Sequence, residues 1–167
     1  MRLISIDPGP TQSAYVTWDT EKDDFLEVIL YANKGLINNQ DLYASVPELL
    51  SFQPEIIAIE MIQSYGTPLG RPSFETILFV GKLTGEFERQ GARETFMVGG
   101  PLKVKYYGRP TIKGQVGGKN DTQIRASLRL RYGEAKKGCK LEGVKKDIWA
   151  ALALATALTE RPNLKEW

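Results

Sequence analysis

Two apolar segments of this chain each end on an acidic residue. Residues 2–6 (RLISI) lead directly into Asp7, and residues 56–59 (IIAI) lead directly into Glu60. Near-continuous apolar runs of this length are typical of strands that are buried on both faces of a sheet. A carboxylate at the end of such a strand is expected to be paired, protonated or bound to a metal ion, because an unpaired buried charge is strongly unfavourable.

A third acidic residue, Asp147, precedes an alanine-rich helical pattern, IWAALALA. Open α/β sheets bind their ligands beyond the carboxyl ends of the strands, which is where Asp7 and Glu60 are expected to lie. Each acid taken alone could simply cap a following turn or helix. Taken together, the three acids favour a divalent-metal site of the kind that nucleases use.

Composition removes several other chemistries. The chain has 167 residues, 42% of them hydrophobic, which suits one domain spanning residues 1–167 with a full core. It has no histidine, which excludes Ser–His and Cys–His catalysis and histidine metal sites. Its one cysteine, Cys139, forms neither an internal disulfide nor a thiolate cluster. Any chemistry is therefore left to carboxylates and lysines.

The sequence has no apolar stretch that approaches the roughly 20 residues of a membrane helix. Its start, MRLISIDPG, also lacks the apolar region and cleavage site of a signal peptide. We therefore expect a cytoplasmic protein with no membrane partner.

Charge is strongly polarised along the chain, although the net charge is only +2. Residues 101–146 contain 13 Lys and Arg against 3 Asp and Glu, a net charge of +10, and the remaining residues have a net charge of −8. A basic segment that also contains tyrosines suits the phosphate backbone of a nucleic acid. A basic run by itself is more often a solvated surface, but beside an acidic metal site the nucleic-acid interpretation is the stronger one.

The pattern of apolar residues and breakers predicts a meander of three strands, then a helix, a parallel strand, and alternating helices and strands. The expected strands are 2–7, 13–18, 25–31, 56–60 and 95–98. The expected helices are 41–52, 73–90 with Ser73 as its cap, a short one carrying residues 103–107, 121–132 with Asp121 as its cap, and 145–160. Residues 63–72 and 108–120 are expected to form loops. This order indicates a mixed α/β or α+β fold with helices on both faces of one sheet.

Six segments, in this order, identify a family resemblance: MRLISIDPG, EIIAIE, ETILFVGKLTGE, GGPLKVKYYG, GGKNDTQI and DIWAALALA. In order and spacing they resemble the RuvC-like Holliday junction resolvases of the ribonuclease H-like superfamily, and the resemblance covers nearly the whole chain. It implies a five-stranded mixed sheet with helices on both faces. The short chain without histidine resembles a phage or other divergent branch.

The resemblance implies that Asp7, Glu60 and Asp147 are the catalytic metal ligands. A second aspartate of the family's last motif would stand at Ala150, three residues after Asp147. Either this lineage completes the site otherwise, for example with Glu142 or a water, or the chain is an engineered form in which alanine replaced that aspartate. We favour the second interpretation, because one change restores the motif, and it predicts an impaired enzyme.

The resemblance also implies cofactors and partners. Two Mg²⁺ ions, for which Mn²⁺ can substitute, would promote attack by a metal-bound water that leaves a 5′-phosphate and a 3′-hydroxyl. The substrate would be a four-way junction or other branched DNA, cut symmetrically by a homodimer in which residues 73–90 form the dimer surface. Lys119 would act in catalysis by neutralising the scissile phosphate. The residues expected to bind DNA are Tyr65, Arg71, Lys103, Lys105, Tyr106, Arg109, Lys113, Lys119 and Arg125.

Three other functions stay open at this point. A different ribonuclease H-like nuclease, acting on forks, flaps or RNA:DNA hybrids, would use the same acids. A junction-binding protein that does not cut would keep the basic segment, and Ala150 makes that a real alternative. An actin-like kinase or ATPase shares the IDPG turn but requires a second phosphate-binding motif and a far longer chain.

Overall fold

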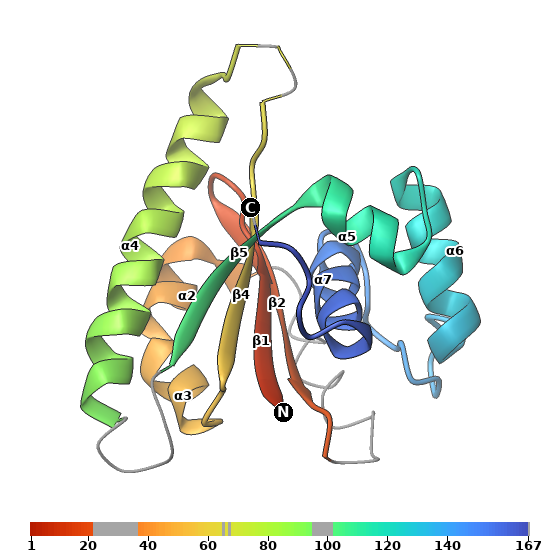
Figure 1. The fold of residues 1–167 in the computed structure, drawn as a ribbon, viewed down its shortest axis with the longest axis horizontal. Coiled ribbons are helices and arrows are strands. Elements are labelled where there is room, and N and C mark those ends of the chain that lie inside the picture. The colour runs from red at the N-terminus through yellow and green to blue at the C-terminus, as the bar shows by residue number, and fades with distance from the viewer. Residues whose placement is uncertain (22–36, 65, 67, 95–101, 167) are drawn as a thin grey trace.

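The computed structural model describes residues 1–21, 37–64, 66, 68–94 and 102–166. Its centre is a five-stranded sheet in the order β3-β2-β1-β4-β5, with helices on both faces (Figure 1). The strands are β1 (Arg2–Asp7), β2 (Gln12–Asp19), the two-residue β3 (Ile37–Asn38), β4 (Ile56–Met61) and β5 (Lys103–Gly108). Strand β1 runs antiparallel to β2 and parallel to β4, which runs parallel to β5. The predicted mixed α/β fold is confirmed.

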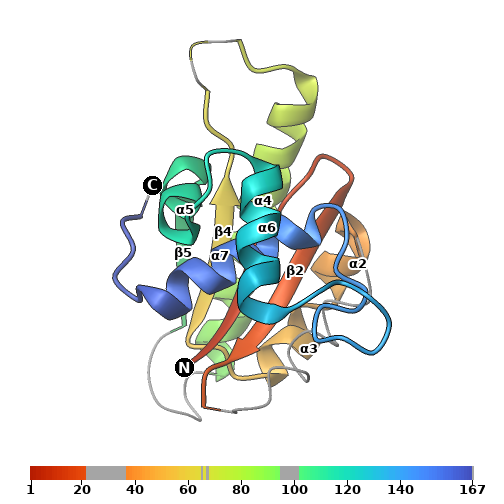
Figure 2. The same ribbon diagram turned by 90° about the vertical axis from the view of Figure 1, so that its right-hand side faces the viewer.

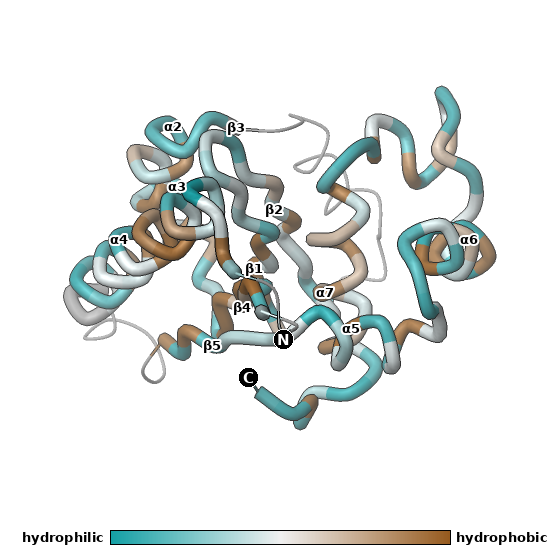
Figure 3. The backbone as a smooth tube through the Cα atoms, turned by 90° about the horizontal axis from the view of Figure 1, so that it is seen from above, coloured by the Kyte–Doolittle hydropathy of each residue, from teal (hydrophilic) through white to brown (hydrophobic). Residues whose placement is uncertain are grey.

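Two helical layers cover the sheet. The first contains α2 (Asn39–Ala44), α3 (Val46–Ser51) and α4 (Arg71–Glu94). The second contains α5 (Arg109–Val116), α6 (Asp121–Tyr132) and α7 (Ile148–Glu160), and Figure 2 looks onto this layer. Hydrophobic residues follow the strands and the helix sides that face them (Figure 3).

Alternation along each strand divides the core between these layers. Leu3 of β1 and Ala58 of β4 pack in the core that contains α7, whereas Ile4 and Ile57 pack in the core beneath α4. The reason is the two-residue period of a strand, which sends successive side chains to opposite faces. The same parity decides which layer each strand-end acid will face.

Helix α7 lies directly on the sheet. All its residues from Ala151 to Leu158 are buried, as expected for a helix that is apolar on every side. The Ser5 hydroxyl of β1 donates a 2.7 Å hydrogen bond to the carbonyl of Ala151, which ties the start of α7 to the strand that carries Asp7. Among the described helices, none has the length and hydropathy that crossing a bilayer requires.

The single helix predicted for residues 41–52 is wrong, because two short helices, α2 and α3, occupy this segment. Ser45 is both the C-cap of α2 and the N-cap of α3, and Pro47 lies in the first turn of α3. Proline has no backbone N–H and clashes with the preceding turn, so it is tolerated at a helix start but not in a helix interior.

The segment after residue 102 also differs from the prediction. Residues 103–107 form strand β5 instead of a short helix, and residues 109–116 form helix α5 instead of a loop. Hydrogen bonding to β4 selects the strand, with Glu60 opposite Tyr107. Pro110 then lies in the first turn of α5, where its fixed backbone angle suits a helix start.

Several predicted boundaries shift. Helix α4 begins at Arg71, so Ser73 lies inside it and is not its cap, and α7 begins at Ile148 rather than near residue 145. The extent of α6 was predicted correctly, but its cap is Asn120 and not Asp121, because the Asn120 side chain accepts a hydrogen bond from the Gln123 N–H. The predicted strands 25–31 and 95–98 lie outside the described residues.

Candidate active site

Strand register brings Asp7 and Glu60 together at one edge of the sheet. Ile6 of β1 is paired in parallel with Ile59 of β4, so the next residues, Asp7 and Glu60, are neighbours. Asp7 has the parity of Leu3 and Ser5, and Glu60 has the parity of Ala58, so both acids face the α7 layer. Glu60 is buried and Asp7 is half-buried.

Asp147 reaches the same edge from the α7 layer, which is the layer that Asp7 and Glu60 face. It is the N-cap residue of α7, but its side chain makes no capping hydrogen bond, so the carboxylate is left for other contacts. The residue before it, Lys146, has a φ of 48°, in the left-handed region that residues with a Cβ rarely adopt. This turn ends the preceding loop and sets the direction from which Asp147 enters the site.

The left-handed turn at Lys146 can be tested by measuring stability, without an assay of enzymatic activity. Lys146→Gly is expected to be more stable than Lys146→Ala by about 1 kcal/mol, because only glycine adopts the left-handed conformation without steric cost. Urea unfolding of the two variants measures this difference, and both have lost the same charge. At Lys145 the glycine variant should not be more stable than the alanine variant. Greater stability of the glycine variant at both positions would contradict this explanation.

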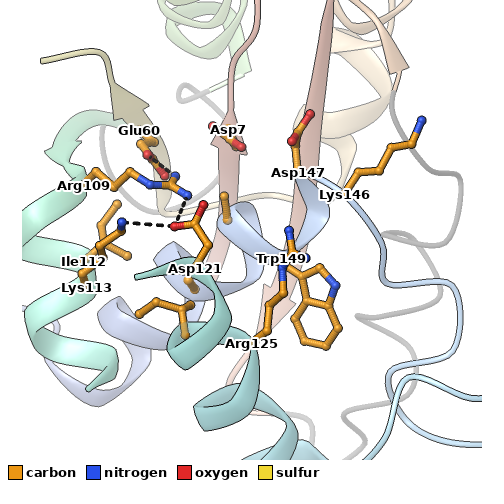
Figure 4. Close-up of a pocket in the computed structure, with 13 residues that line it drawn as sticks. Asp7, Glu60, Arg109, Ile112, Lys113, Asp121, Arg125, Lys146, Asp147 and Trp149 are labelled. Atoms are coloured by element: carbon orange, nitrogen blue, oxygen red, sulfur yellow. Dashed lines mark hydrogen bonds and ion pairs between the residues drawn. The ribbon is translucent and has the colours of Figure 1, made fainter. Parts of the chain in front are cut away.

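These acids surround a cavity of about 60 Å³, which has room for a few waters or ions. Its acidic lining residues are Asp7, Glu60, Asp121 and Asp147, which come from β1, β4, the start of α6 and the N-cap of α7 (Figure 4). Its basic and apolar lining residues are Arg109, Lys113, Arg125, Lys146, Ile112, Ile124, Trp149, Ala150 and Ala153.

Arg109 joins two of the acids. Its Nη1 donates to Oε1 of Glu60 at 2.6 Å, and its Nη2 donates to Oδ1 of Asp121 at 3.0 Å. Nζ of Lys113 lies 3.1 Å from the same Asp121 oxygen (Figure 4). Arg109 is placed here because it directly follows Gly108, the last residue of β5, which is paired with Met61 at the end of β4.

Sequence reasoning missed Asp121 as a site residue and assigned it to capping α6. Because Asn120 performs the capping, the Asp121 carboxylate faces the cavity and its two cationic partners. A capping asparagine directly before an aspartate in the segment GGKND is the signal that could have indicated this.

Burial is the largest influence on the pKa values of Asp7, Glu60 and Asp121 in the cavity, and neighbouring charges modify its effect. Burial, together with the nearby charge of Glu60, raises the pKa of Asp7 to about 8, and Arg109 only partly offsets this. Burial also raises the pKa of Glu60, although the Arg109 guanidinium opposes the shift. The pKa of Asp121 is lowered, because its hydrogen bonds to Arg109 and Lys113 outweigh the effect of burial.

The residues that line this cavity suit a divalent cation. Among the described residues, none gives the Asp7 carboxylate a hydrogen bond or an ion pair, and Glu60 already binds a cationic group. The donors are carboxylate oxygens, which suit Mg²⁺ and Mn²⁺. Within the described part of the chain, however, no three acids stand close enough to form a complete metal-ligand set. The residues fit a metal, but side chains must move to hold one.

Comparisons with known proteins bear on the fold. Neither a protein-family model nor a curated protein sequence matches this chain. Among solved structures, RuvC from Thermus thermophilus matches with a TM-score of 0.65 and 18% identity over 100% of both chains. Its complex with a Holliday junction substrate matches equally well, over 99% of that chain. The yeast mitochondrial Holliday junction resolvase Ydc2 matches with a TM-score of 0.57 and 11% identity, over 93% of this chain and 78% of that one.

The chain has the RuvC fold. At identities of 18% and 11%, these matches establish the arrangement of the helices and strands. They do not assign a role to any individual residue, which must be argued from the geometry of the site.

Within this RuvC fold, Ala150 lines the cavity on the first turn of α7 and is half-buried. An acid at this position would therefore face Asp7, Glu60 and Asp147. Glu142, which we considered as a replacement, does not line the cavity, and its carboxylate accepts a hydrogen bond from the N–H of Gly138. Asp121 is the fourth acid that the cavity contains.

The RuvC fold gathers only some of the predicted DNA-binding residues. Arg109, Lys113 and Arg125 line the cavity, and Lys119 lines a depression of about 460 Å³ beside it, to which Arg109 and Lys113 also contribute. The four residues that lie elsewhere are Arg71, Lys103, Lys105 and Tyr106.

Local contacts account for most of those four positions. Arg71 is paired with Glu75 on α4, and Lys105 is paired with Glu166. The hydroxyl of Tyr106 donates to Thr84, which places this side chain on the α4 face of the sheet, opposite the cavity. Tyr65 lies outside the described residues.

Proposed function

We propose that this protein is a structure-selective endonuclease that resolves four-way DNA junctions by metal-dependent phosphodiester hydrolysis. One observation carries the proposal: acids from the ends of β1 and β4 and from the start of α7 line one cavity that adjoins a basic depression, and this occurs in a RuvC fold. Two of the neighbouring structures are described as a Holliday junction complex and a Holliday junction resolvase.

Each group of side chains has its own role in this proposal. Asp7, Glu60 and Asp147 would hold Mg²⁺ or Mn²⁺, which would supply Lewis-acid stabilisation of the attacking and leaving oxygens. Arg109, Lys113 and Lys119, which share the depression, would bind phosphate groups and orient the strand. Lys119 is exposed beside the cavity, so its ammonium group can reach a scissile phosphate.

The decisive experiment uses labelled four-way junctions and matched linear duplex, with forks, flaps and RNA:DNA hybrids as further substrates. We expect retardation of the junction at concentrations that leave the duplex free, and paired symmetric incisions that need Mg²⁺ or Mn²⁺. Equal affinity for junction and duplex would contradict the proposal. Preferential incision of flaps or hybrids would assign the site to another nuclease of this fold.

A second candidate, a junction-binding protein that does not cut, is favoured by Ala150. Three acids remain at the positions that the resemblance assigns to metal ligands, and the position of the fourth carries a methyl group. Retardation of the junction without incision at any Mn²⁺ concentration, both in this chain and in Ala150→Asp, would support this candidate over the nuclease.

We further propose that the protein acts as a homodimer joined through α4. Phe74 and Leu78 are 55% and 66% exposed, although both are large and apolar. Gly81 and Gly85 continue the same stripe, and a Cβ at either glycine would meet no atom within 4 Å. The spacing of four, three and four residues is that of a helix-pairing seam, and a twofold pair would give two active sites for two incisions.

Leu78→Glu is expected to convert the dimer to a monomer, because it places a charge in the centre of the apolar stripe. Sedimentation velocity measures the change in mass. Leu130→Glu is a matched control, because Leu130 is 90% exposed but lies on α6. A wild-type protein that is monomeric at high concentration, or a Leu78→Glu variant that stays dimeric, would contradict this surface.

A further inference from the structure

A single guanidinium group holds two carboxylates of the cavity at once. Arg109 uses Nη1 for Glu60 and Nη2 for Asp121, at 2.6 Å and 3.0 Å. The side chain of Glu60 is 10% exposed and that of Arg109 is 35% exposed, so this contact is largely shielded from water. Shielding strengthens the charge-assisted hydrogen bonds of this contact, but the cost of removing both charges from water offsets much of that gain, so the contact can be exchanged for another partner.

This pairing occupies one oxygen of a proposed metal ligand. Oε1 of Glu60 faces a guanidinium nitrogen, and the neighbouring Asp7 has no hydrogen-bond or ion-pair partner among the described residues. Within the same described ranges, no three acids form a ready metal site. Glu60 can therefore give Oε1 to a divalent cation, beside Asp7, only after Arg109 has left that oxygen.

Asp121 determines where Arg109 goes when it leaves Glu60. The two nitrogens of the fork bind different acids, so breaking the Glu60 contact leaves the Asp121 contact in place. Asp121 is itself held by Lys113, and Asn120 keeps it at the start of α6. Because Arg109 also lines the basic depression with Lys113 and Lys119, the freed Nη1 would face the proposed phosphate path.

We propose that Arg109 is a displaceable counter-cation: it neutralises Glu60 until a divalent cation binds, and then, retained by Asp121, it turns to a DNA phosphate. This inference rests on the proposed function. It assigns Asp121 as a positioning residue that acts through Arg109. It also couples cation binding to DNA binding, since the same event fills the acid cluster and releases a phosphate-binding group.

The test measures Mn²⁺ affinity by electron paramagnetic resonance in four proteins: wild type, Arg109→Gln, Lys113→Gln and Asp7→Asn. Arg109→Gln removes the group that competes with the cation for Glu60. We therefore expect this variant to bind Mn²⁺ about tenfold more tightly than wild type, which corresponds to the loss of one hydrogen bond to a charged group. Lys113→Gln is the matched control, because it also removes one positive charge that contacts Asp121 but does not touch Glu60. Its gain should be clearly smaller, and equal gains in the two variants would overturn the inference.

A second test combines an NMR titration, which needs no variant in the cavity to fold, with a measurement of junction affinity. In the unmodified protein labelled with ¹⁵N-arginine, the Nε–H signal of Arg109 should shift when Mg²⁺ is added, and the Arg71 signal should not. With Ca²⁺, which binds carboxylates without promoting cleavage, junction affinity should rise several-fold in wild type and less in Arg109→Gln. An Arg109 signal that ignores Mg²⁺ overturns the inference.

The metal site and the role of Arg109 are tested by different variants. If Asp7→Asn binds Mn²⁺ as wild type does, the proposed metal site is wrong and the nuclease function fails with it. If Asp7→Asn loses Mn²⁺ while Arg109→Gln matches Lys113→Gln, the metal site stands and only the role of Arg109 is refuted.

Discussion

Replacing Asp7 by Asn is expected to abolish metal-dependent incision and, at the same time, to stabilise the metal-free protein at pH 8. Incision should fall by at least about 10²-fold to 10³-fold, the usual cost of removing one group that stabilises transition-state charge. Stability should rise because the Asp7 carboxylate is desolvated and lies beside Glu60 and Asp147, and asparagine has no charge to repel them.

The sign of the stability change follows from the pKa of Asp7, which burial and Glu60 raise from 3.8 to about 8. Between these pH values the folded protein keeps a proton that the unfolded chain has released. The contribution of Asp7 is therefore fully present below about pH 4 and is lost as the pH rises to 8, by at most about 1.4 kcal/mol per pH unit. The Asp7→Asn variant does not lose stability in this way. The difference in free energy of unfolding between Asp7→Asn and wild type should therefore increase with pH.

Urea unfolding at pH 5, 6.5 and 8 in EDTA measures this effect. Glu88→Gln on α4 is a suitable control, because Glu88 is exposed and far from the cavity, and it should follow wild type at each pH. Added Mg²⁺ should stabilise wild type and not Asp7→Asn, since only a protein that binds a ligand gains stability from it. Parallel pH profiles for wild type and Asp7→Asn would refute the assigned environment of Asp7.

Ala150→Asp is expected to increase incision of a four-way junction on the order of 10²-fold in Mg²⁺. Position 150 lies three residues after Asp147, on the same side of α7, and its side chain lines the cavity. A carboxylate here would add a hard oxygen ligand beside Asp7 and Asp147, where the chain now has only a methyl group.

The same substitution should lower stability without metal, because the cavity already contains four acids. Thermal unfolding in EDTA and in Mn²⁺ measures both effects, and the gap between the two conditions should widen in Ala150→Asp. Ala150→Asn has nearly the same shape without the charge and separates packing from ligation. Equal incision by the Asp and Asn variants would show that this position contributes no metal ligand.

Much of the candidate site follows from local sequence rules. Alternation along MRLISID and EIIAIE places Asp7 and Glu60 on the sheet face that carries Leu3 and Ala58, because a strand has a period of two. Helix α6 was predicted with its correct bounds from Asp121 as its cap and Gly133 as its end, although the residue that caps it is Asn120.

Other elements could not be predicted from local rules. The segment KVKYYG follows a Gly-Gly-Pro sequence that suggests a helix start, yet it forms β5 because its backbone groups pair with β4, which lies more than 40 residues earlier. Tertiary hydrogen bonds of this kind override local propensity. Helix α5, and with it the position of Arg109, follows from where β5 ends.

Residue types alone indicate a site built from carboxylates instead of histidines or thiols, and the apolar runs place two of these carboxylates at the ends of buried strands. The partners of the carboxylates depend on how the strands are arranged in the folded protein. Arg109 and Glu60 are 49 residues apart and meet because β5 lies beside β4 in parallel register. Capping and alternation depend on a few neighbouring residues, whereas such an ion pair depends on the order of strands in the sheet.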